Sequence, residues 1–210
     1  LSLPRGCESD IYDLLKAYKT KINWQDERFE GKKITIEFNG TLRMEQQDAV
    51  NELLKYENGV LSATTAFGKT VVAAYCISKQ KVNTLILVHR QQLLSQWLER
   101  LSEFLRIDEV LPELEKKRGR KRKQNIIGHM AAGNNKLNGI IDVAIMQSLY
   151  SDGEVKECVK QYGMIIVDEC HHIPAFSFEQ IVKRSTAKFI YGLTATPARK
   201  DGHHPIIFMH

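Results

Sequence analysis

Short apolar runs alternate with amphipathic segments along most of the chain. Runs that are short, apolar and rich in β-branched residues predict buried strands over 58–62, 83–88, 126–127, 141–146, 163–167 and 188–193. Apolar residues that recur at helical spacing predict helices over 43–56, 69–80, 91–105, 153–161 and 175–184. Strands that alternate with helices in this way favour an α/β fold, in which a parallel sheet carries helices on both faces.

The first forty residues precede this alternation and have a different pattern. Residues 10–21 predict a helix whose apolar residues share one face, namely Ile11, Leu14, Leu15 and Tyr18. Residues 34–38 alternate between apolar and polar, which predicts a half-buried strand. We therefore expect residues 1–40 to form a small N-terminal accessory segment and residues 41–210 to form the main domain.

The loop over residues 63–70 lies between a predicted strand and a predicted helix, and it reads Ala-Thr-Thr-Ala-Phe-Gly-Lys-Thr. A loop in this position directs its backbone N–H groups toward a phosphate, and the positive end of the helix dipole adds to the attraction. Gly68 would let the backbone approach the ligand, Lys69 would reach the β- and γ-phosphates, and Thr70 would hold Mg²⁺ through its hydroxyl. The usual pattern has glycine where this chain has Ala63, and an ordinary turn before a helix is the alternative.

Two acidic residues, Asp168 and Glu169, follow directly after the apolar run 163–167. Ligands of open α/β sheets bind at the carboxyl ends of the strands, so these carboxylates are expected beside the phosphate loop. Asp168 would contact Mg²⁺, and Glu169 would orient and deprotonate the attacking water. A charge pair at the N-terminus of a helix is the alternative. Together with the loop, the pair predicts a nucleotide triphosphatase.

Six segments in a fixed order resemble the motifs of a known superfamily. They read LRMEQQDA at 42–49, ATTAFGKT at 63–70, LILVHRQQLL at 85–94, IMQSL at 145–149, DECHH at 168–172 and GLTATP at 192–197. The chain is similar to the first RecA-like lobe of superfamily 2 helicases and translocases. Within that superfamily it resembles the XPB-like and type III restriction-type motors of the DEAH/DECH kind. The resemblance covers residues 42–202 and implies a RecA-like P-loop NTPase fold.

The resemblance implies a role for each matching position. The implied ATP-binding residues are Arg43, Gln46 at the adenine-reading position, Ala66, Phe67, Gly68, Lys69, Thr70 and Val71. The implied catalytic residues are Lys69, Asp168 and Glu169, and the implied Mg²⁺ ligands are Thr70 and Asp168. Residues implied to couple the nucleotide state to the grip on nucleic acid are His171, His172, Thr194 and Thr196. Contacts to nucleic-acid phosphates are implied for His89, Arg90, Gln147 and Ser148.

These features predict the ATP-binding lobe of an ATP-dependent helicase or translocase that acts on DNA rather than RNA, with ATP and Mg²⁺ as cofactors. The sequence ends soon after the last motif, so we expect the second RecA-like lobe, with its arginine finger, outside it and weak ATP hydrolysis by this lobe alone. A nucleotide-gated DNA-binding scaffold and the motor of a restriction or defence system are alternatives. Residues 42–49 and the Thr-Ala-Thr of 194–196 argue against a P-loop kinase or GTPase.

The positive net charge of +5 comes from one local tract. Residues 116–123 read Lys-Lys-Arg-Gly-Arg-Lys-Arg-Lys, and without them the net charge would be negative. Such a block cannot be buried, so we expect a basic, solvated insert near 112–125. Two interpretations stay open: the tract contacts the phosphate backbone of a nucleic acid, or it is a flexible insert with no specific target.

Cysteine usage and hydropathy favour an intracellular, cytoplasmic protein. The four cysteines, at positions 7, 76, 158 and 170, have no paired spacing, which fits a reducing compartment. No run approaches 18 apolar residues, so no membrane span is expected. The cysteine and histidines of 170–172 and 203–210 lack the spacing of zinc ligands, and no nucleophile-elbow serine predicts a hydrolase triad. Trp97 is predicted to be a core residue rather than a stacking platform for bases.

Overall fold

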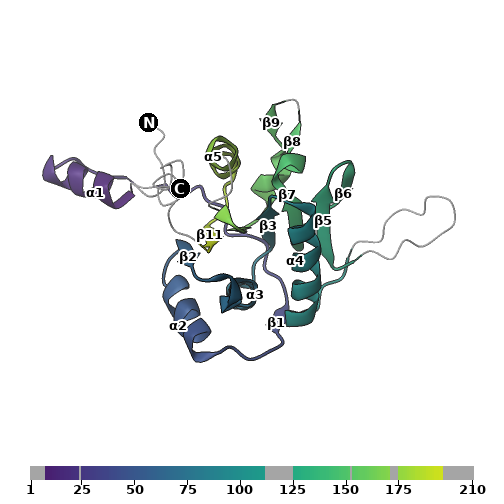
Figure 1. Cartoon of the computed structure of the whole chain (residues 1–210). Coiled ribbons are helices and arrows are strands. Elements are labelled where there is room, and N and C mark those ends of the chain that lie inside the picture. The colour runs from purple at the N-terminus through teal and green to yellow at the C-terminus, as the bar shows by residue number, and fades with distance from the viewer. Residues whose placement is uncertain (1–7, 24, 112–124, 152, 171–174, 196–210) are drawn as a thin grey trace.

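Seven strands form one sheet at the centre of the protein (Figure 1). The structure is a computed structural model that describes residues 8–23, 25–111, 125–151, 153–170 and 175–195. The strands, in spatial order, are β2 (Asn58–Ser62), β11 (Phe189–Thr194), β10 (Met164–Val167), β3 (Thr84–Val88), β7 (Ile141–Ile145), β5 (Ile127–Ala131) and β6 (Asn134–Lys136). All neighbouring pairs are parallel except β5 and β6, so the predicted α/β fold is confirmed.

Helices cover both faces of this sheet, as predicted (Figure 1). One face carries α2 (Met44–Leu53), α3 (Lys69–Gln80) and α4 (Gln91–Phe104), and the other carries η3 (Met146–Leu149), η4 (Glu157–Gln161) and α5 (Ala175–Arg184). Alternate residues of β3 divide between the two faces: Leu85 and Leu87 pack on the α5 side, while Ile86 and Val88 pack on the α3 side. A strand that is buried on both faces is apolar throughout, and this explains the uninterrupted apolar runs in the sequence.

Most predicted elements are confirmed within a few residues, but the predicted helix over 153–161 is wrong. The chain instead forms a short hairpin of β8 (Tyr150–Ser151) and β9 (Glu154–Val155), followed by the 3₁₀ turn η4. Gly153 has φ +82°, a left-handed conformation that interrupts a helix but suits a hairpin turn. The Asp152-Gly153 dipeptide was the sequence signal for such a turn.

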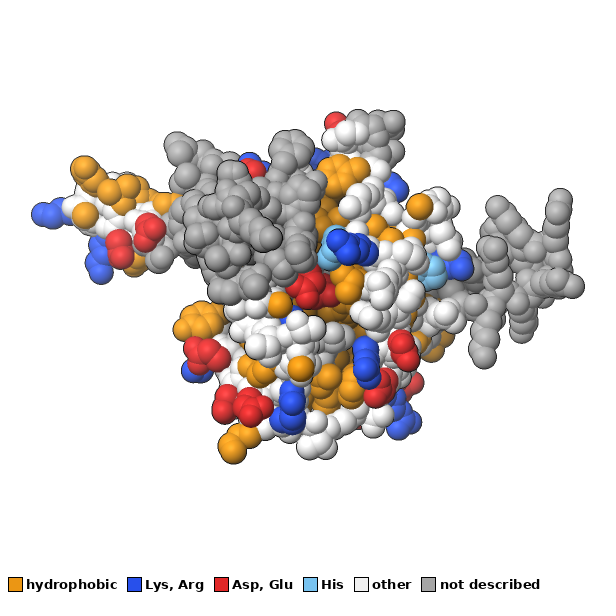
Figure 2. All heavy atoms as spheres, viewed as in Figure 1, with side chains coloured by type: hydrophobic (Ala, Val, Ile, Leu, Met, Phe, Trp, Pro, Cys, Tyr) orange, Lys and Arg blue, Asp and Glu red, His pale blue; other side chains and the backbone are white. Residues whose placement is uncertain are grey.

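The predicted N-terminal helix is present but shorter, and as α1 (Glu8–Ala17) it projects from the rest of the protein (Figure 1). Tyr12, Leu14 and Tyr18 are exposed, and Figure 2 shows apolar side chains along this projecting helix. Packing therefore contributes little to its stability. Among the residues that the structure describes, neither α1 nor any other helix is long and apolar enough to cross a membrane.

The second half of the first forty residues lies against the main domain. The predicted strand is confirmed as β1 (Ile36–Phe38), which pairs in antiparallel fashion with β4 (Leu105–Ile107) directly after α4. Ile34 is buried in the same group of side chains as α3 and α4, and the ring of Phe38 stacks on Phe104 with centroids 6.0 Å apart. This part of the chain thus adds to the core on the α3 side of the sheet.

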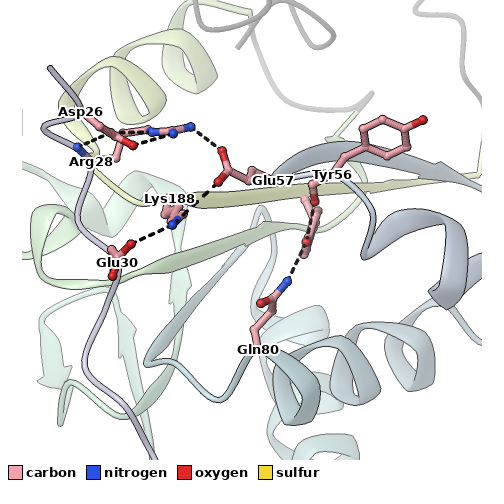
Figure 3. A network of polar contacts seen from close by, with 8 residues as sticks. Asp26, Arg28, Glu30, Tyr56, Glu57, Gln80 and Lys188 are labelled. Carbon is pink, nitrogen blue, oxygen red and sulfur yellow. Dashed lines mark hydrogen bonds and ion pairs between the residues drawn. The ribbon is translucent and has the colours of Figure 1, made fainter. Parts of the chain in front are cut away.

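Residues 26–34 continue along the edge of the sheet at which the parallel strands begin, which we call the amino-terminal edge. Main-chain bridges join Phe29 to Ala187 and Lys33 to Val82. Ion pairs reinforce these bridges, as Figure 3 shows: Arg28 contacts Asp26 and Glu57, and Lys188 contacts Glu30 and Glu57. The edge is therefore covered by a strap of extended chain.

Asn83, immediately before β3, fastens several segments at this amino-terminal edge. Its side-chain oxygen accepts hydrogen bonds from the backbone N–H groups of Lys32 at 2.8 Å and Gly163 at 3.1 Å. Its amide nitrogen donates to the carbonyls of Gly139 at 3.1 Å and Gln161 at 2.6 Å. The side chain is fully buried, so one amide satisfies four backbone groups in three different segments.

Candidate active site

The loop after β2 and the acidic pair after β10 lie at the opposite edge of the sheet, which we call the carboxyl-terminal edge. In the sheet order, β11 alone separates β2 from β10. The backbone N–H of Ala63 donates to the carbonyl of Thr194, the last residue of β11, at 3.0 Å. Two strand spacings put the backbones of the loop and the acids about 10 Å apart. The sheet order therefore brings the two predicted motifs to one place.

Gly68 lies between the 3₁₀ turn of the phosphate loop and the helix that follows, where it is the N-cap residue. Residues 65–67 form a 3₁₀ turn, Gly68 has φ +83°, and α3 begins at Lys69. A Cβ atom at Gly68 would lie 2.6 Å from the side-chain nitrogen of Gln46, closer than real contacts allow. Glycine is needed here both for its left-handed backbone and for the space that it leaves. The strand–loop–helix unit that the sequence predicts is present.

Arg43 and Gln46, at the start of α2, bind the backbone carbonyls of the loop. The side-chain oxygen of Gln46 accepts the backbone N–H of Arg43 at 2.9 Å, and its amide donates to the carbonyl of Phe67 at 2.7 Å. The Arg43 guanidinium also donates to the Phe67 carbonyl and reaches the Ala66 carbonyl at 3.5 Å. Both ends of the buried Gln46 amide thus engage the protein, while the reading of adenine by Gln46 stays a prediction.

Lys69 lies across the loop rather than out in solvent. Its ammonium donates to the carbonyls of Ala63 at 3.0 Å and Thr64 at 3.4 Å, and only 7% of the residue is exposed. Residues 64–66 of the loop are exposed, whereas Thr70 and Val71 are half-buried at the start of α3. The loop thus offers its backbone to a ligand and keeps a cation directly beneath it.

Asp168 is buried at the end of β10 and accepts two hydrogen bonds. The indole N–H of Trp97, on α4, donates to one carboxylate oxygen at 2.7 Å, and the backbone N–H of Glu169 donates to the other at 3.0 Å. Burial raises the pKa of the Asp168 carboxyl above its usual range. The Trp97 hydrogen bond and the nearby Lys69 charge act in the opposite direction, and the Glu169 charge adds to the rise. The site therefore holds a carboxylate that favours an added positive charge.

Glu169 has an unusual backbone conformation for its residue type. Its φ is +48°, in the left-handed region that non-glycine residues rarely adopt, and its side chain is half-buried. Strain of this kind costs on the order of 1–3 kcal/mol and persists where the surrounding structure imposes it.

The donor groups at this edge suit Mg²⁺. A carboxylate and a hydroxyl, from Asp168 and Thr70, are the hard oxygen ligands that Mg²⁺ prefers. Each carboxylate oxygen of Asp168 keeps a lone pair beyond the hydrogen bond that it accepts. The described residues contain no group of three or more His, Cys, Asp or Glu side chains that could hold a metal. Mg²⁺ does not require one, because phosphate oxygens and water complete its shell.

The residues predicted to contact nucleic acid follow two neighbouring strands at the same edge. His89 and Arg90 come directly after β3, Gln147 and Ser148 lie in η3 after β7, and these strands pair in parallel. Arg90 and Gln147 are exposed. Lys156, which the sequence interpretation missed, donates from its ammonium to the carbonyl of Ser148 at 2.8 Å. Among the described side chains on the face shown in Figure 2, acidic, basic and apolar groups are interspersed, and no large area of them carries one sign of charge.

Several predicted residues lie outside the part of the chain that the structure describes. These are His171, His172, Thr196 and the basic tract 116–123. Thr194 is described: it is buried at the end of β11, where its carbonyl accepts the Ala63 N–H. The roles assigned to all of them stay predictions.

Trp97 is buried on its helix, as predicted, but its hydrogen bond to Asp168 was missed. Leu94, Trp97 and Leu101 share the buried face of α4, and this helical spacing was the signal for a core position. Spacing along one helix says nothing about the direction of an indole N–H toward a residue more than seventy positions away.

A phosphate loop between strand and helix, beside a strand that ends in two acids, defines a nucleotide-binding lobe of the P-loop α/β class. The chain belongs to the family described as type III restriction enzyme, res subunit, whose model matches residues 39–199. It is a first RecA-like lobe of superfamily 2, in the XPB-like and restriction-type group that the six motifs predict.

Comparison with known proteins agrees with this assignment. The chain is 34% identical over 165 residues to the DNA 3'-5' translocase XPB2 of Sulfurisphaera tokodaii, covering 79% of this chain and 33% of that protein. Its structure resembles the UvsW helicase of bacteriophage T4, with a TM-score of 0.66 at 19% identity over 98% of this chain and 76% of that one.

A further similar structure is the Sulfolobus solfataricus SWI2/SNF2 ATPase core in complex with dsDNA, with a TM-score of 0.55 at 19% identity over 88% of this chain and 38% of that one. These two structural likenesses show the RecA-like fold. The chain spans about a third of the length of the translocase that it matches.

Proposed function

We propose that this chain is the ATP-binding lobe of an ATP-dependent motor that moves on DNA. The observation that carries the proposal is the placement of Lys69 and Asp168 at the carboxyl-terminal edge: Lys69 donates to the loop carbonyl of Ala63, and β11 alone separates that loop from the strand that ends at Asp168. A buried cation and a buried carboxylate at the end of a parallel sheet are the two groups that a magnesium–triphosphate complex requires.

In the proposed reaction, water attacks the γ-phosphate of ATP. The backbone N–H groups of loop 64–68 and the ammonium of Lys69 bind the β- and γ-phosphates, for which Lys69 exchanges its present carbonyl partners. Mg²⁺, when bound, neutralises charge on the phosphates, and Thr70 and Asp168 would hold it. Glu169 orients the attacking water and accepts its proton.

Two observations support nucleic acid as the partner of the lobe. The four residues with implied phosphate contacts follow the neighbouring strands β3 and β7, so they form one row beside the nucleotide site. The relative from Sulfurisphaera tokodaii is named a DNA translocase, and one of the two similar structures is bound to dsDNA. DNA is therefore the favoured partner, with a second RecA-like lobe as the partner that completes the ATPase. Location in the cytoplasm stays a prediction.

Binding of Mg²⁺-ATP should depend on Lys69. Lys69→Ala is expected to weaken binding of a fluorescent ATP analogue by at least tenfold, since a buried point charge on the phosphates is lost. The matched control is Lys79→Ala on the exposed side of the same helix, where the ammonium lies over the ring of Tyr75. Equal affinity in the parent and Lys69→Ala would contradict the phosphate-loop assignment. A scaffold without turnover would bind ATP but show no DNA-stimulated hydrolysis in the full-length protein.

A further inference from the structure

Trp97 connects the core of α4 directly to the acidic pair. Its indole N–H donates to Asp168 at 2.7 Å, and the two residues are 2% and 7% exposed. The second carboxylate oxygen of Asp168 accepts the backbone N–H of Glu169 at 3.0 Å. Because each oxygen receives one N–H donor from a different element, the plane of the carboxylate is fixed by both.

The indole is a suitable group for this task. Its nitrogen can only donate a hydrogen bond, so it cannot compete with Asp168 for a cation, and it leaves each carboxylate oxygen one free lone pair. The ring lies among buried apolar side chains, between Leu94 and Leu101 on the same face of α4, and cannot turn away without displacing them. A rigid donor therefore sets the direction of the carboxylate.

We propose that Trp97 is a positioning residue of the nucleotide site: its indole N–H holds the Asp168 carboxylate in the orientation that receives Mg²⁺ together with the nucleotide. The proposal rests on the function proposed above. The sequence predicts only a core position for Trp97. The proposal adds a role in the chemistry of the site.

The start of α4 adds a consequence. Arg90, which is implied to contact nucleic acid, caps this helix, and its carbonyl accepts the backbone N–H of Leu94 at 3.2 Å. Trp97 lies two helical turns further on, about 10 Å along the axis. The helix α4 therefore carries both Arg90, which is implied to contact nucleic acid, and the donor that orients Asp168.

The test measures the Mg²⁺ dependence of nucleotide binding. Trp97→Phe keeps an aromatic ring in the core but removes the donor. Titration of Mg²⁺ in the presence of a fluorescent ATP analogue should show about a tenfold higher half-saturating Mg²⁺ concentration, the scale of one hydrogen bond to a charged group. Affinity for the analogue in EDTA should stay within about twofold of the parent, because the loop and Lys69 are untouched.

Two further variants separate positioning from packing. Ile77→Val makes a cavity in the same core, on α3 rather than on the helix that carries the indole, and it should keep the parental Mg²⁺ dependence. Replacement of Trp97 by β-(3-benzothienyl)alanine keeps the shape of the indole ring and exchanges its N–H for sulfur. It should raise the half-saturating Mg²⁺ concentration as Trp97→Phe does. This variant still tests the proposal if the smaller ring of phenylalanine impairs folding.

The outcomes are distinct. A parental Mg²⁺ dependence in both Trp97 variants would overturn the positioning role and leave the proposed function intact. An equal loss of affinity with Mg²⁺ and with EDTA would also overturn it, since that pattern belongs to a packing defect. If the parent itself binds no nucleotide at any Mg²⁺ concentration, the proposed function fails and the role of Trp97 fails with it.

Discussion

The two edges of the same sheet differ in how their polar groups are satisfied. At the amino-terminal edge, Asn83 makes four hydrogen bonds and the strap of residues 26–34 is held by main-chain bridges and ion pairs. At the carboxyl-terminal edge, Asp168 is buried with a raised pKa, and Glu169 adopts a left-handed backbone. The amino-terminal edge thus pairs its polar groups within the protein. The carboxyl-terminal edge keeps a buried carboxylate and a strained backbone, which are features that cluster at functional sites.

The difference follows from the direction of the strands. Loops that follow parallel strands meet at one edge, and their backbone N–H groups and side chains can converge on a ligand. The opposite edge receives the ends of helices and, in this protein, an extended segment that covers it. Disturbing a group at the carboxyl-terminal edge should therefore affect chemistry, whereas disturbing one at the amino-terminal edge should affect folding.

The largest effect is expected from Glu169→Gln. The substitution keeps the size of the side chain and removes its ability to accept a proton, so ATP turnover by the full-length protein should fall about 10²–10⁴-fold while ATP binding persists. The control is Glu57→Gln at the amino-terminal edge, where the carboxylate pairs with Arg28 and Lys188. A steady-state ATPase assay compares the two. Undiminished turnover in Glu169→Gln would remove this residue from the role of base.

The next effect is on stability, at the amino-terminal edge. Asn83→Ala leaves two N–H groups and two carbonyls without their present partner, which should lower the free energy of unfolding by about 3 kcal/mol. Urea denaturation checks this value. Asn39→Ala is the matched control, since that exposed amide makes one bond of 3.3 Å to the Glu103 carbonyl. A loss below about 1 kcal/mol for Asn83→Ala would show that the hydrogen bonds of this side chain add little to the fold.

The sequence predicts the carboxyl-terminal edge better than the amino-terminal one, for a physical reason. Phosphate binding requires glycine, lysine and a hydroxyl residue at adjacent positions, so residues 68–70 are visible as a local pattern. The hydrogen bonds of Asn83 join segments that are far apart in the chain, and no local pattern marks them. The hydrogen bond from Trp97 to Asp168 could not be predicted for the same reason.

Secondary structure shows the same contrast between local and distant causes. The strand over 164–167 and the helix over 69–80 have apolar patterns that tertiary contacts reinforce, and both are confirmed. Residues 153–161 have helical spacing, but the turn at Gly153 and the pairing of Tyr150 with Val155 override it. The missed turn signal, rather than the spacing, decides the structure of that segment.

The smallest expected effect is on the free energy of unfolding, and it tests whether a charged side chain at the amino-terminal edge contributes to stability. Hydrogen bonds from Arg28 hold the pKa of the Asp26 carboxyl well below its usual range. A carboxyl with a lowered folded-state pKa stabilises the fold above its unfolded pKa of about 4, and that contribution is lost as the pH falls through the folded value. Asp26 is more than half exposed, so solvent screening keeps the contribution below about 1 kcal/mol.

Asp26→Asn should therefore lower the free energy of unfolding slightly at pH 7. The difference from the parent should shrink as the pH falls below about 4, because the unfolded parent then takes up a proton that the folded parent binds only at lower pH. Urea denaturation at pH 7 and at pH 3 measures both values. Asp13→Asn, an exposed position on the projecting helix α1, makes the same change in net charge away from the edge. If the two variants have the same stability at pH 7, the charge of Asp26 adds nothing measurable to the fold. The other ion pairs, the hydrogen bonds of Asn83 and the main-chain bridges would then account for how the strap is held.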